Sequence, residues 1–451
     1  MAAGTAPLRS GSTGSPRRIL LLGVGTLLAV AACAADPSAP LRTVVVEEDG
    51  VHRLVRNGRT YVIRGAGGET HLDRLAAAGG NSIRTWGADN LGRILDEAHR
   101  HGLTVCAGLW LGHERHGFDY ADRSAVLQQL ETSLETVRRF KDHPALLMWG
   151  IGNEMEGDGT NPAIWKAVEE IARQVKRIDP DHPTMTVIAE LGNDKVQSIE
   201  RFCPSIDIVG VNSYGGITTG GARYRAAGGT KPYVITELGP PGPWEVGKTA
   251  WGSPIEMTST DKGEWYAKGF RKAVTEQHGL CLGSYAFFWG HKQETTATWF
   301  GMLLPDGSRL APVDATVEAW TGAPPENLCP RIVSLEADRT ARLRPGDVVT
   351  AKLSAWDPEN DPLKIRWVLR ADSRTVGSGG DFQPDETSFD AAVSASGATA
   401  KVTLPSRTGG YRLFAYVFDN AGGAAVANLP LHVENPAAGP GSTDRAKPES
   451  R

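Results

Sequence analysis

Two glutamates occupy the positions in this sequence that are best suited to acid and nucleophilic chemistry. Glu154 follows the apolar run 146–151, and Glu237 follows the apolar run 233–236. Each run predicts a buried strand, so each carboxyl group would stand at a strand end in a partly desolvated setting. Cleavage of a glycosidic bond needs two opposed carboxyls, because one protonates the leaving oxygen while the other attacks the anomeric carbon.

The elements that must position these side chains alternate between strands and helices over residues 43–323. The expected strands are 59–64, 81–86, 103–111, 146–151, 184–189, 206–211, 233–236 and 283–289, with helices such as 91–101, 125–140 and 164–178 between them. Eight β/α units favour a closed (β/α)8 TIM barrel, whose active sites form at the carboxyl ends of the strands. The rival is an open doubly wound sheet, and the lack of a GxGxxG after the first strand disfavours it.

Beyond Pro324 and Pro325 the pattern changes to β-rich alternation. The strands expected there are 331–337, 348–355, 364–370, 400–404, 411–418 and 424–433. They predict a small all-β, Ig-like sandwich over 328–434, followed by a disordered tail over 435–451. The stretch 356–363 resembles a loop of cadherin-like and polycystic-kidney-disease-type sandwiches. Calcium could bind its oxygens, although turns rich in Asp, Asn and Pro need no metal.

The barrel segment resembles the retaining glycoside hydrolases of clan A. The resemblance is carried by Asn153-Glu154, by the Thr-Glu-Leu-Gly that contains Glu237, and by Trp289 at the expected end of strand eight. The stretches 80–86, 142–145 and 211–214 support it. The nearest likeness, over 51–322, is to the catalytic barrel of glycoside hydrolase family 2, with family 5 as its neighbour. Upstream, only a hairpin-like segment, 44–62, is expected in place of the sandwich domains that usually precede a family 2 barrel.

The resemblance implies roles for the residues that match the family pattern. Glu154 would be the general acid/base and Glu237 the nucleophile of a double displacement, with the carboxyls about 5 to 5.5 Å apart. Asn153 would hydrogen-bond the sugar 2-hydroxyl. Taken singly, a glutamate after a strand is more often a helix-terminal residue or an ion-pair partner, but two glutamates with Asn153 and Trp289 in matching places favour catalysis.

Further side chains would surround the reacting sugar. Arg84 would lie near Glu237 and favour its ionised form, while desolvation and the neighbouring anion would raise the pKa of Glu154. Tyr214 would donate to the nucleophile, and Trp289 would form the floor under the sugar. The alternatives are an interior ion pair for Arg84 and core packing for Tyr214. Trp86, Trp110 and Trp244 are candidates for stacking on sugars or for loop anchors.

Charged residues near the expected site leave the charge of the substrate open. Glu190 closes strand five and is the first alternative to Glu154. A basic rim follows strands three and eight, formed by His113, Arg115, His116, His291 and Lys292. It could meet an anionic sugar such as a uronate, although a solvated loop is the simpler interpretation.

The amino terminus predicts export. Arg9, Arg17 and Arg18 precede the apolar run 19–31, which is too short to span a membrane and is followed by Cys33. We interpret 1–33 as a signal peptide with a lipobox, so that lipidation of Cys33 would anchor the protein at a membrane surface. An ordinary signal, giving a secreted protein, is the alternative.

Export makes the remaining cysteines possible disulfide partners. Cys106 lies in an apolar run and is expected to be a buried thiol. Cys203 and Cys281 precede strands and Cys329 follows the last helix, so all three were expected at the amino-terminal face of the barrel. We therefore favour a disulfide between Cys281 and Cys329.

Composition excludes some classes of function. The 451 residues include 48 Lys and Arg against 52 Asp and Glu, with a net charge of −4 and no long basic run, which argues against nucleic-acid binding. No motif supports a metal or an organic cofactor at the catalytic centre. The sequence thus predicts a glycosidase acting on a β-linked poly- or oligosaccharide. The alternatives are a transglycosylase using the same intermediate and an inactive glycan-binding surface protein.

Overall fold

The computed structural model describes residues 41–373 and 381–434. The predicted signal with Cys33 and the predicted disordered tail, 435–451, lie outside the described residues, so export, lipidation and disorder stay predictions. Among the helices in the described ranges, none has both the length and the apolar character needed to cross a membrane.

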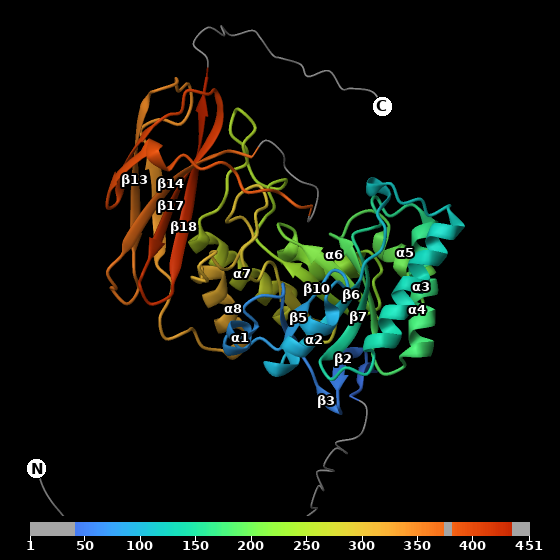
Figure 1. Ribbon diagram of the computed structural model, residues 1–451. Coiled ribbons are helices and arrows are strands. Elements are labelled where there is room, and N and C mark those ends of the chain that lie inside the picture. The colour runs from blue at the N-terminus through green and yellow to red at the C-terminus, as the bar shows by residue number, and fades with distance from the viewer. Residues whose placement is uncertain (1–40, 374–380, 435–451) are drawn as a thin grey trace, which may run out of the picture. The chain divides into compact units, whose positions relative to one another are not determined.

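Eight parallel strands close into a barrel, with helices arranged around it (Figure 1). In chain order these strands are β4 (Ile63–Gly67), β5 (Ser82–Arg84), β6 (Thr104–Leu109), β7 (Leu146–Asn153), β8 (Thr184–Ala189), β9 (Ile208–Ser213), β10 (Tyr233–Leu238) and β11 (Cys281–Ala286). Each strand pairs with the next in sequence, and β11 pairs with β4 to close the ring. The prediction of a (β/α)8 barrel is confirmed.

Eight α-helices and four 3-10 turns lie in the described residues, and some of the α-helices begin or end at residues with local capping signals. They are α1 (Leu72–Ala77), α2 (Leu91–Arg100), α3 (Arg123–Phe140), α4 (Pro162–Ile178), α5 (Lys195–Phe202), α6 (Gly220–Ala226), α7 (Ser259–Ala273) and α8 (Ala311–Thr321), with 3-10 turns η1 (Glu114–His116), η2 (Ile217–Thr219), η3 (Thr275–Gln277) and η4 (Asp390–Ala392). At the start of α3 the Asp122 carboxylate accepts from two backbone N–H groups, and at α4 Asn161 accepts from one. Gly322, with φ 83°, ends α8 in the left-handed conformation that glycine tolerates best.

A small antiparallel sheet covers the amino-terminal end of the barrel. It consists of β1 (Thr43–Glu48), β2 (Val51–Arg56) and β3 (Arg59–Thr60). Leu54 of β2 is buried in the same apolar cluster as Met148, Met185 and other side chains of the barrel strands. The expected first barrel strand, 59–64, was therefore wrong in part: its first two residues pair with β2, and the barrel strand begins at Ile63.

The chain continues after α8 into an all-β unit of two antiparallel sheets. One sheet has the order β12 (Arg331–Ala337), β13 (Val348–Trp356), β16 (Thr399–Thr403) and β15 (Val393–Ser396); the other has β14 (Lys364–Ala371), β17 (Gly409–Phe418) and β18 (Ala424–Val433). Side chains from both sheets form one apolar core, which confirms the all-β prediction. Sequence reasoning missed β15, a short strand with mostly exposed side chains. The immunoglobulin-like character stays a prediction.

The loop that suggested calcium is held by the side chain of Asp357. The Oδ1 atom of Asp357 accepts from the N–H groups of Glu359 and Asp361 at 3.0 and 2.9 Å. Within the described residues, no group of three or more His, Cys, Asp or Glu side chains is placed to hold a metal ion.

The predicted disulfide between Cys281 and Cys329 is wrong, since all four cysteines in the described residues are free thiols. Cys281 opens β11 at the amino-terminal face of the barrel. The backbone N–H of Cys329 donates to Asp314, in the first turn of α8, at 2.6 Å. A helix that follows a barrel strand starts near the opposite, carboxyl-terminal face. The chain after α8 therefore runs back along the helix and carries Cys329 away from Cys281.

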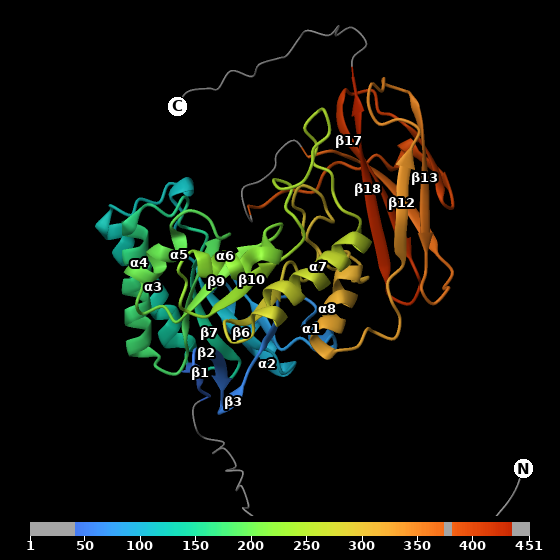
Figure 2. The same ribbon diagram turned by 180° about the vertical axis from the view of Figure 1, so that it is seen from behind.

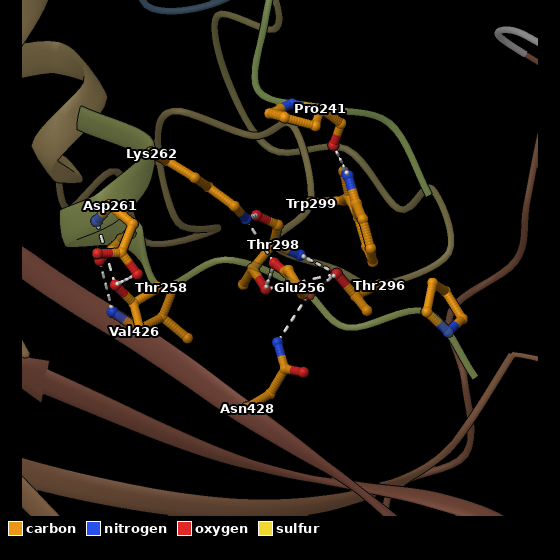
Figure 3. Close-up of polar contacts among 12 residues, drawn as sticks. Pro241, Glu256, Thr258, Asp261, Lys262, Thr296, Thr298, Trp299, Val426 and Asn428 are labelled. Atoms are coloured by element: carbon orange, nitrogen blue, oxygen red, sulfur yellow. Dashed lines mark hydrogen bonds and ion pairs between the residues drawn. The ribbon is translucent and has the colours of Figure 1, made fainter. Parts of the chain in front are cut away.

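A buried polar interface joins the all-β unit to the barrel. Helix α7 lies beside β12 and β18 (Figure 2). Glu256, just before α7, receives hydrogen bonds from Lys262 at 2.5 Å, from Thr296 at 2.6 Å and from Asn428 of β18 at 2.7 Å (Figure 3). Burial alone would raise the pKa of Glu256, but the Lys262 ammonium and these hydrogen bonds lower it, so this carboxylate is ionised in the interior.

A second buried ion pair lies at the same interface. Arg412 of β17, which is 1% exposed, contacts the Asp372 carboxylate at 2.9 Å and donates to Ser253 at 2.7 Å and to the Pro254 carbonyl at 3.0 Å. Buried charges are tolerated only when they are paired and hydrogen-bonded, so both groups require the barrel loop and the sheet to be in place together.

We expect Lys262→Met to lower the free energy of unfolding by about 3 to 5 kcal/mol, because it leaves the buried Glu256 carboxylate without its cation. Urea unfolding followed by circular dichroism measures this loss. The matched control is Lys166→Met at an exposed position of α4, for which a change within about 0.5 kcal/mol is expected. Equal losses in the two variants would contradict the importance assigned to the pair.

Candidate active site

A cavity of about 750 Å³ opens at the carboxyl ends of the barrel strands, within the usual size range of ligand pockets. Its lining combines aromatic and acidic side chains from several strand ends and loops. The lining residues are Trp86, Trp110, His116, Asn153, Glu154, Ala189, Glu190, Asn212, Tyr214, Glu237, Trp244, Glu245, Phe287, Phe288, Lys292, Glu294 and Asp381. Both predicted glutamates are among them.

The backbone is irregular at the ends of β7 and β10, and this changes the direction in which the side chains point. The pairing of β7 with β8 shifts register between Ile151 and Asn153, and the pairing of β10 with β9 shifts between Ile235 and Glu237. Glu154 itself has φ 53°, a left-handed conformation that is uncommon outside glycine. Such irregularities interrupt the alternation of side chains across a strand, so neighbouring residues such as Asn153 and Glu154 can both line the cavity.

Three donors hold the Glu237 carboxylate. Oε1 accepts from Arg84 at 3.0 Å and from the indole N–H of Trp86 at 2.7 Å, and Oε2 accepts from the Tyr214 hydroxyl at 2.5 Å. Burial raises the pKa of Tyr214 and the nearby Glu237 charge raises it further, so the phenol keeps the proton that it donates. Arg84 and Tyr214 thus lie where the sequence placed them, beside Glu237.

Asn153 and Asn212 connect the two glutamates. Oδ1 of Asn153 accepts from Arg84 at 2.6 Å and from the Asn212 amide at 3.1 Å. The same Asn212 amide donates to Oε1 of Glu154 at 2.6 Å, while Oδ1 of Asn212 accepts from the Thr236 hydroxyl at 2.8 Å. With its oxygen engaged on the protein side, Asn153 has its amide nitrogen to offer to a ligand hydroxyl.

The setting of Glu154 favours its protonated form. Burial raises the pKa of its carboxyl to about 7, the Glu237 charge adds to the rise, and the Asn212 hydrogen bond opposes it. Within the described part of the chain, no ion pair to Glu154 accompanies the one between Arg84 and Glu237. Below about pH 7 the site therefore holds one proton-bearing and one cation-paired carboxyl, the division of roles that acid and nucleophile require.

Aromatic side chains line both the inner and the outer cavity, but they are not all the predicted ones. Strand β11 ends at Ala286, three residues before Trp289. Trp289 is 1% exposed, and its indole donates to the His71 carbonyl at 3.2 Å, so the expectation that it forms the floor of the site is wrong. Phe287 and Phe288 line the cavity instead.

The three other predicted tryptophans lie at the cavity, in two different settings. Trp86 is hydrogen-bonded to Glu237, as described above. Trp110 and Trp244 are 49% and 46% exposed, so part of each indole is accessible to a ligand. Trp110 stacks on His113 with ring centroids 4.8 Å apart, and Trp244 packs edge-on against Tyr214.

The predicted basic rim carries little unbalanced charge. Burial and the neighbouring Arg115 and His116 lower the pKa of His113 to about 4, and burial lowers the pKa of His291. Arg115 and His116 lie 3.6 and 3.4 Å from the Asp381 carboxylate.

Two further charged residues of the cavity are engaged in ion pairs. Lys292 pairs with Glu294. Glu190, the alternative to Glu154, pairs with Arg223 at 3.0 Å and accepts from the Ser213 hydroxyl.

Sequence reasoning assigned no role to several residues that line the cavity. Asn212 stood within a stretch that supported the resemblance, and its position after strand six was a usable signal. Phe287 and Phe288 were overlooked because strand eight was extended to Trp289. Asp381 belongs to the all-β unit, and nothing in its local sequence points to a site in the barrel.

We expect the Glu154 carboxyl to titrate with a midpoint at about pH 7. Glu237→Gln should lower this midpoint because it removes a neighbouring negative charge, whereas Asn212→Ala should raise it because it removes a hydrogen bond to the charged form. Carbon-13 NMR of protein labelled at glutamate measures the midpoint in the wild type and in both variants, and Glu154→Gln assigns the signal. A midpoint near the unperturbed value of about 4.3 would contradict the prediction.

Part of the barrel is similar to known proteins. Residues 79–240 match the family model described as "Glycosyl hydrolases family 2, TIM barrel domain". A protein named beta-glucuronidase from Pongo abelii is 24% identical over 193 residues, and one from Rattus norvegicus is 30% identical over 193 residues; each match covers 39% of this chain. The chain thus spans only 28% of the length of these relatives.

A solved beta-D-glucuronidase from Dictyoglomus thermophilum aligns with 62% of this chain and 54% of its own, at 17% identity and a TM-score of 0.45. The prediction of a clan A barrel nearest to family 2 is confirmed by this match, which covers residues 79–240 of the barrel.

Proposed function

We propose that the protein is a retaining glycosidase that hydrolyses β-linked glycosides of neutral sugars. The observation that carries this proposal is the contrast between the two carboxyl groups of one cavity. Glu237 is paired with Arg84 and held by two further donors, while Glu154 is buried with its pKa raised to about 7. A double displacement needs this combination of an ionised nucleophile and a protonated acid.

In the first half of the reaction, Glu237 attacks the anomeric carbon and forms a glycosyl ester. The bond to the leaving oxygen breaks, and Glu154 gives that oxygen its proton. In the second half, ionised Glu154 takes a proton from water, whose oxygen attacks the same carbon and releases Glu237. Asn153, oriented by Arg84 and Asn212, offers its amide to the sugar 2-hydroxyl.

The charges of the cavity favour a neutral sugar over a uronate. Six of the lining residues carry a carboxyl group, against one lysine and one histidine. Lys292 and His116 are paired with Glu294 and Asp381. A sugar carboxylate would thus enter a region already rich in negative charge, at an electrostatic cost. The names of the relatives make the β-glucuronide the natural comparison substrate.

We expect kcat/KM to fall as the pH rises through about 7, because Glu154 must carry a proton to act as the acid and loses it above its pKa. Glu154→Gln should abolish this limb of the pH profile. It should also reduce turnover of substrates with poor leaving groups by about 10²- to 10⁴-fold. Glu131→Gln, at an exposed position of α3, is the matched control and should leave the profile unchanged.

We expect Glu237→Ala to abolish turnover, and wild-type protein to release a first-formed product with the β configuration of the substrate, as proton NMR can record. A first-formed α anomer would contradict the retaining mechanism. Products longer than the substrate, formed with an added sugar acceptor, would instead identify a transglycosylase. Glycan binding without turnover of any substrate would identify a binding protein.

We expect nitrophenyl β-glycosides of glucose, galactose or mannose to be hydrolysed at least about tenfold more efficiently than the β-glucuronide, because the cavity holds no surplus of cations. Comparing kcat/KM across the four substrates tests this. Higher efficiency on the glucuronide would overturn the neutral-sugar assignment while leaving the catalytic assignment intact.

A further inference from the structure

One residue of the all-β unit lines the cavity of the barrel. Asp381 lies in the connection between β14 and β15, far in sequence from the strand ends that carry the glutamates. Its carboxylate is 3.4 Å from the His116 ring and 3.6 Å from the Arg115 guanidinium, both in the loop after β6. A residue of the all-β unit therefore lies at the mouth of the barrel cavity.

The segment that follows Asp381 is fixed to a second barrel loop. The side-chain oxygen of Gln383 accepts from the backbone N–H of Thr295 at 2.7 Å. Thr295 follows Glu294, which also lines the cavity. Asp381 is thus held between the loop after β6 and the loop after β11.

The buried interface anchors this second loop as well. Thr296 and Thr298 donate to the Glu256 carboxylate at 2.6 and 2.9 Å, and Asn428 of the all-β unit donates to the same group (Figure 3). The wall of the cavity formed by Lys292 and Glu294 is therefore positioned by contacts that include the all-β unit.

The outer cavity differs from the reacting centre. Around Glu237 the lining is buried, as Asn153 at 8% exposed and Asn212 at 2% exposed illustrate. Toward the mouth, Trp110 is half exposed and the Asp381 side chain is 43% exposed. Half-exposed carboxylates and indole faces are suited to the hydroxyls and apolar faces of sugars, so this region can bind units beyond the reacting one.

We propose that Asp381 is a specificity-determining residue of the site, and that the all-β unit completes the substrate pocket by contacting a sugar unit beyond the one being cleaved. This inference rests on the proposed glycosidase function and extends it to the second structural unit. The Asp381 carboxylate accepts hydrogen bonds from hydroxyls of that outer sugar.

The experiment compares nitrophenyl β-glycosides with β-linked tetrasaccharides of glucose, mannose and galactose, using the full chain. Asp381→Ala should raise KM for the tetrasaccharide that is cleaved by about fivefold to tenfold. It should change kcat for that substrate, and kcat/KM for the nitrophenyl glycoside, by less than about twofold. Asp381→Asn should recover part of the loss because its amide oxygen still accepts. The matched control is Glu336→Ala, at an exposed position of β12.

Binding provides a readout that does not depend on turnover. In a Glu237→Ala background, Asp381→Ala should weaken tetrasaccharide binding, measured by calorimetry, by the same factor. Unchanged KM and Kd, equal losses on both classes of substrate, or no tetrasaccharide binding at all would each overturn the inference. Failure of the wild-type chain to cleave any glycoside would instead refute the proposed function, while the comparison of Kd values would still decide the role of Asp381.

Discussion

The buried ion pair between Arg84 and Glu237 is the interaction on which the rest of the site depends. The Arg84 guanidinium contacts Glu237 and the Thr236 carbonyl at 3.0 Å and Asn153 at 2.6 Å, and it is 2% exposed. The interior thus supplies one full cation for two neighbouring carboxyl groups. Since an unpaired buried charge is costly, the second carboxyl, Glu154, is driven to keep its proton. The two carboxyl groups therefore differ in protonation, as acid/base and nucleophilic roles require, because one buried cation serves two carboxyl groups.

Asn212 influences the difference in protonation between the two carboxyl groups, because its hydrogen bond to Glu154 favours the ionised form of that glutamate. Its amide donates both to Glu154 and to Asn153, and Asn153 in turn is bonded to Arg84. The protonation of Glu154 and the position of the asparagine that would meet the sugar are therefore linked through one side chain. A substitution at any of these residues would alter the hydrogen bonding of both carboxyl groups, as expected for a connected polar network in a region of low dielectric.

The sequence predicted the barrel and the placement of both glutamates because their signals are local. Apolar runs of strand length, each followed by a polar residue, identify strand ends, and a closed barrel brings those ends together. It failed at Trp289, because the last residues of a strand and the first residues of a loop have the same composition. It failed at the first barrel strand because residues 59–60 belong to a separate short strand that pairs with β2 and directly precedes the barrel strand. The register shifts beside Asn153 and Glu237 are likewise invisible in a hydrophobic pattern. The pairing of Cys281 with Cys329 failed because it assumed that the chain stays near the end of α8, whereas Cys329 lies beside the first turn of that helix.

Asp381 was beyond sequence reasoning for a different reason. Its place at the cavity depends on how the all-β unit packs against the barrel. That packing combines an apolar cluster, which includes Leu304 and Phe414, with buried ion pairs. Arg412 and Asn428 project from strands whose alternation predicts only a sandwich core, and their partners lie in a barrel loop of irregular structure. Contacts between distant segments of this kind have no local signature.

The family match covers one part of the cavity lining and ends before another part. The matched residues, 79–240, include the hydrogen-bonded network around the two glutamates, which consists of Arg84, Asn153, Glu154, Asn212, Tyr214 and Glu237. They exclude Phe287, Phe288, Lys292, Glu294 and Asp381, which form much of the remaining cavity wall. A substrate is chosen by the wall around it, while the bond is broken by the groups at the centre. The family match therefore covers the network around the two glutamates, while part of the wall that would contact a substrate lies beyond residue 240.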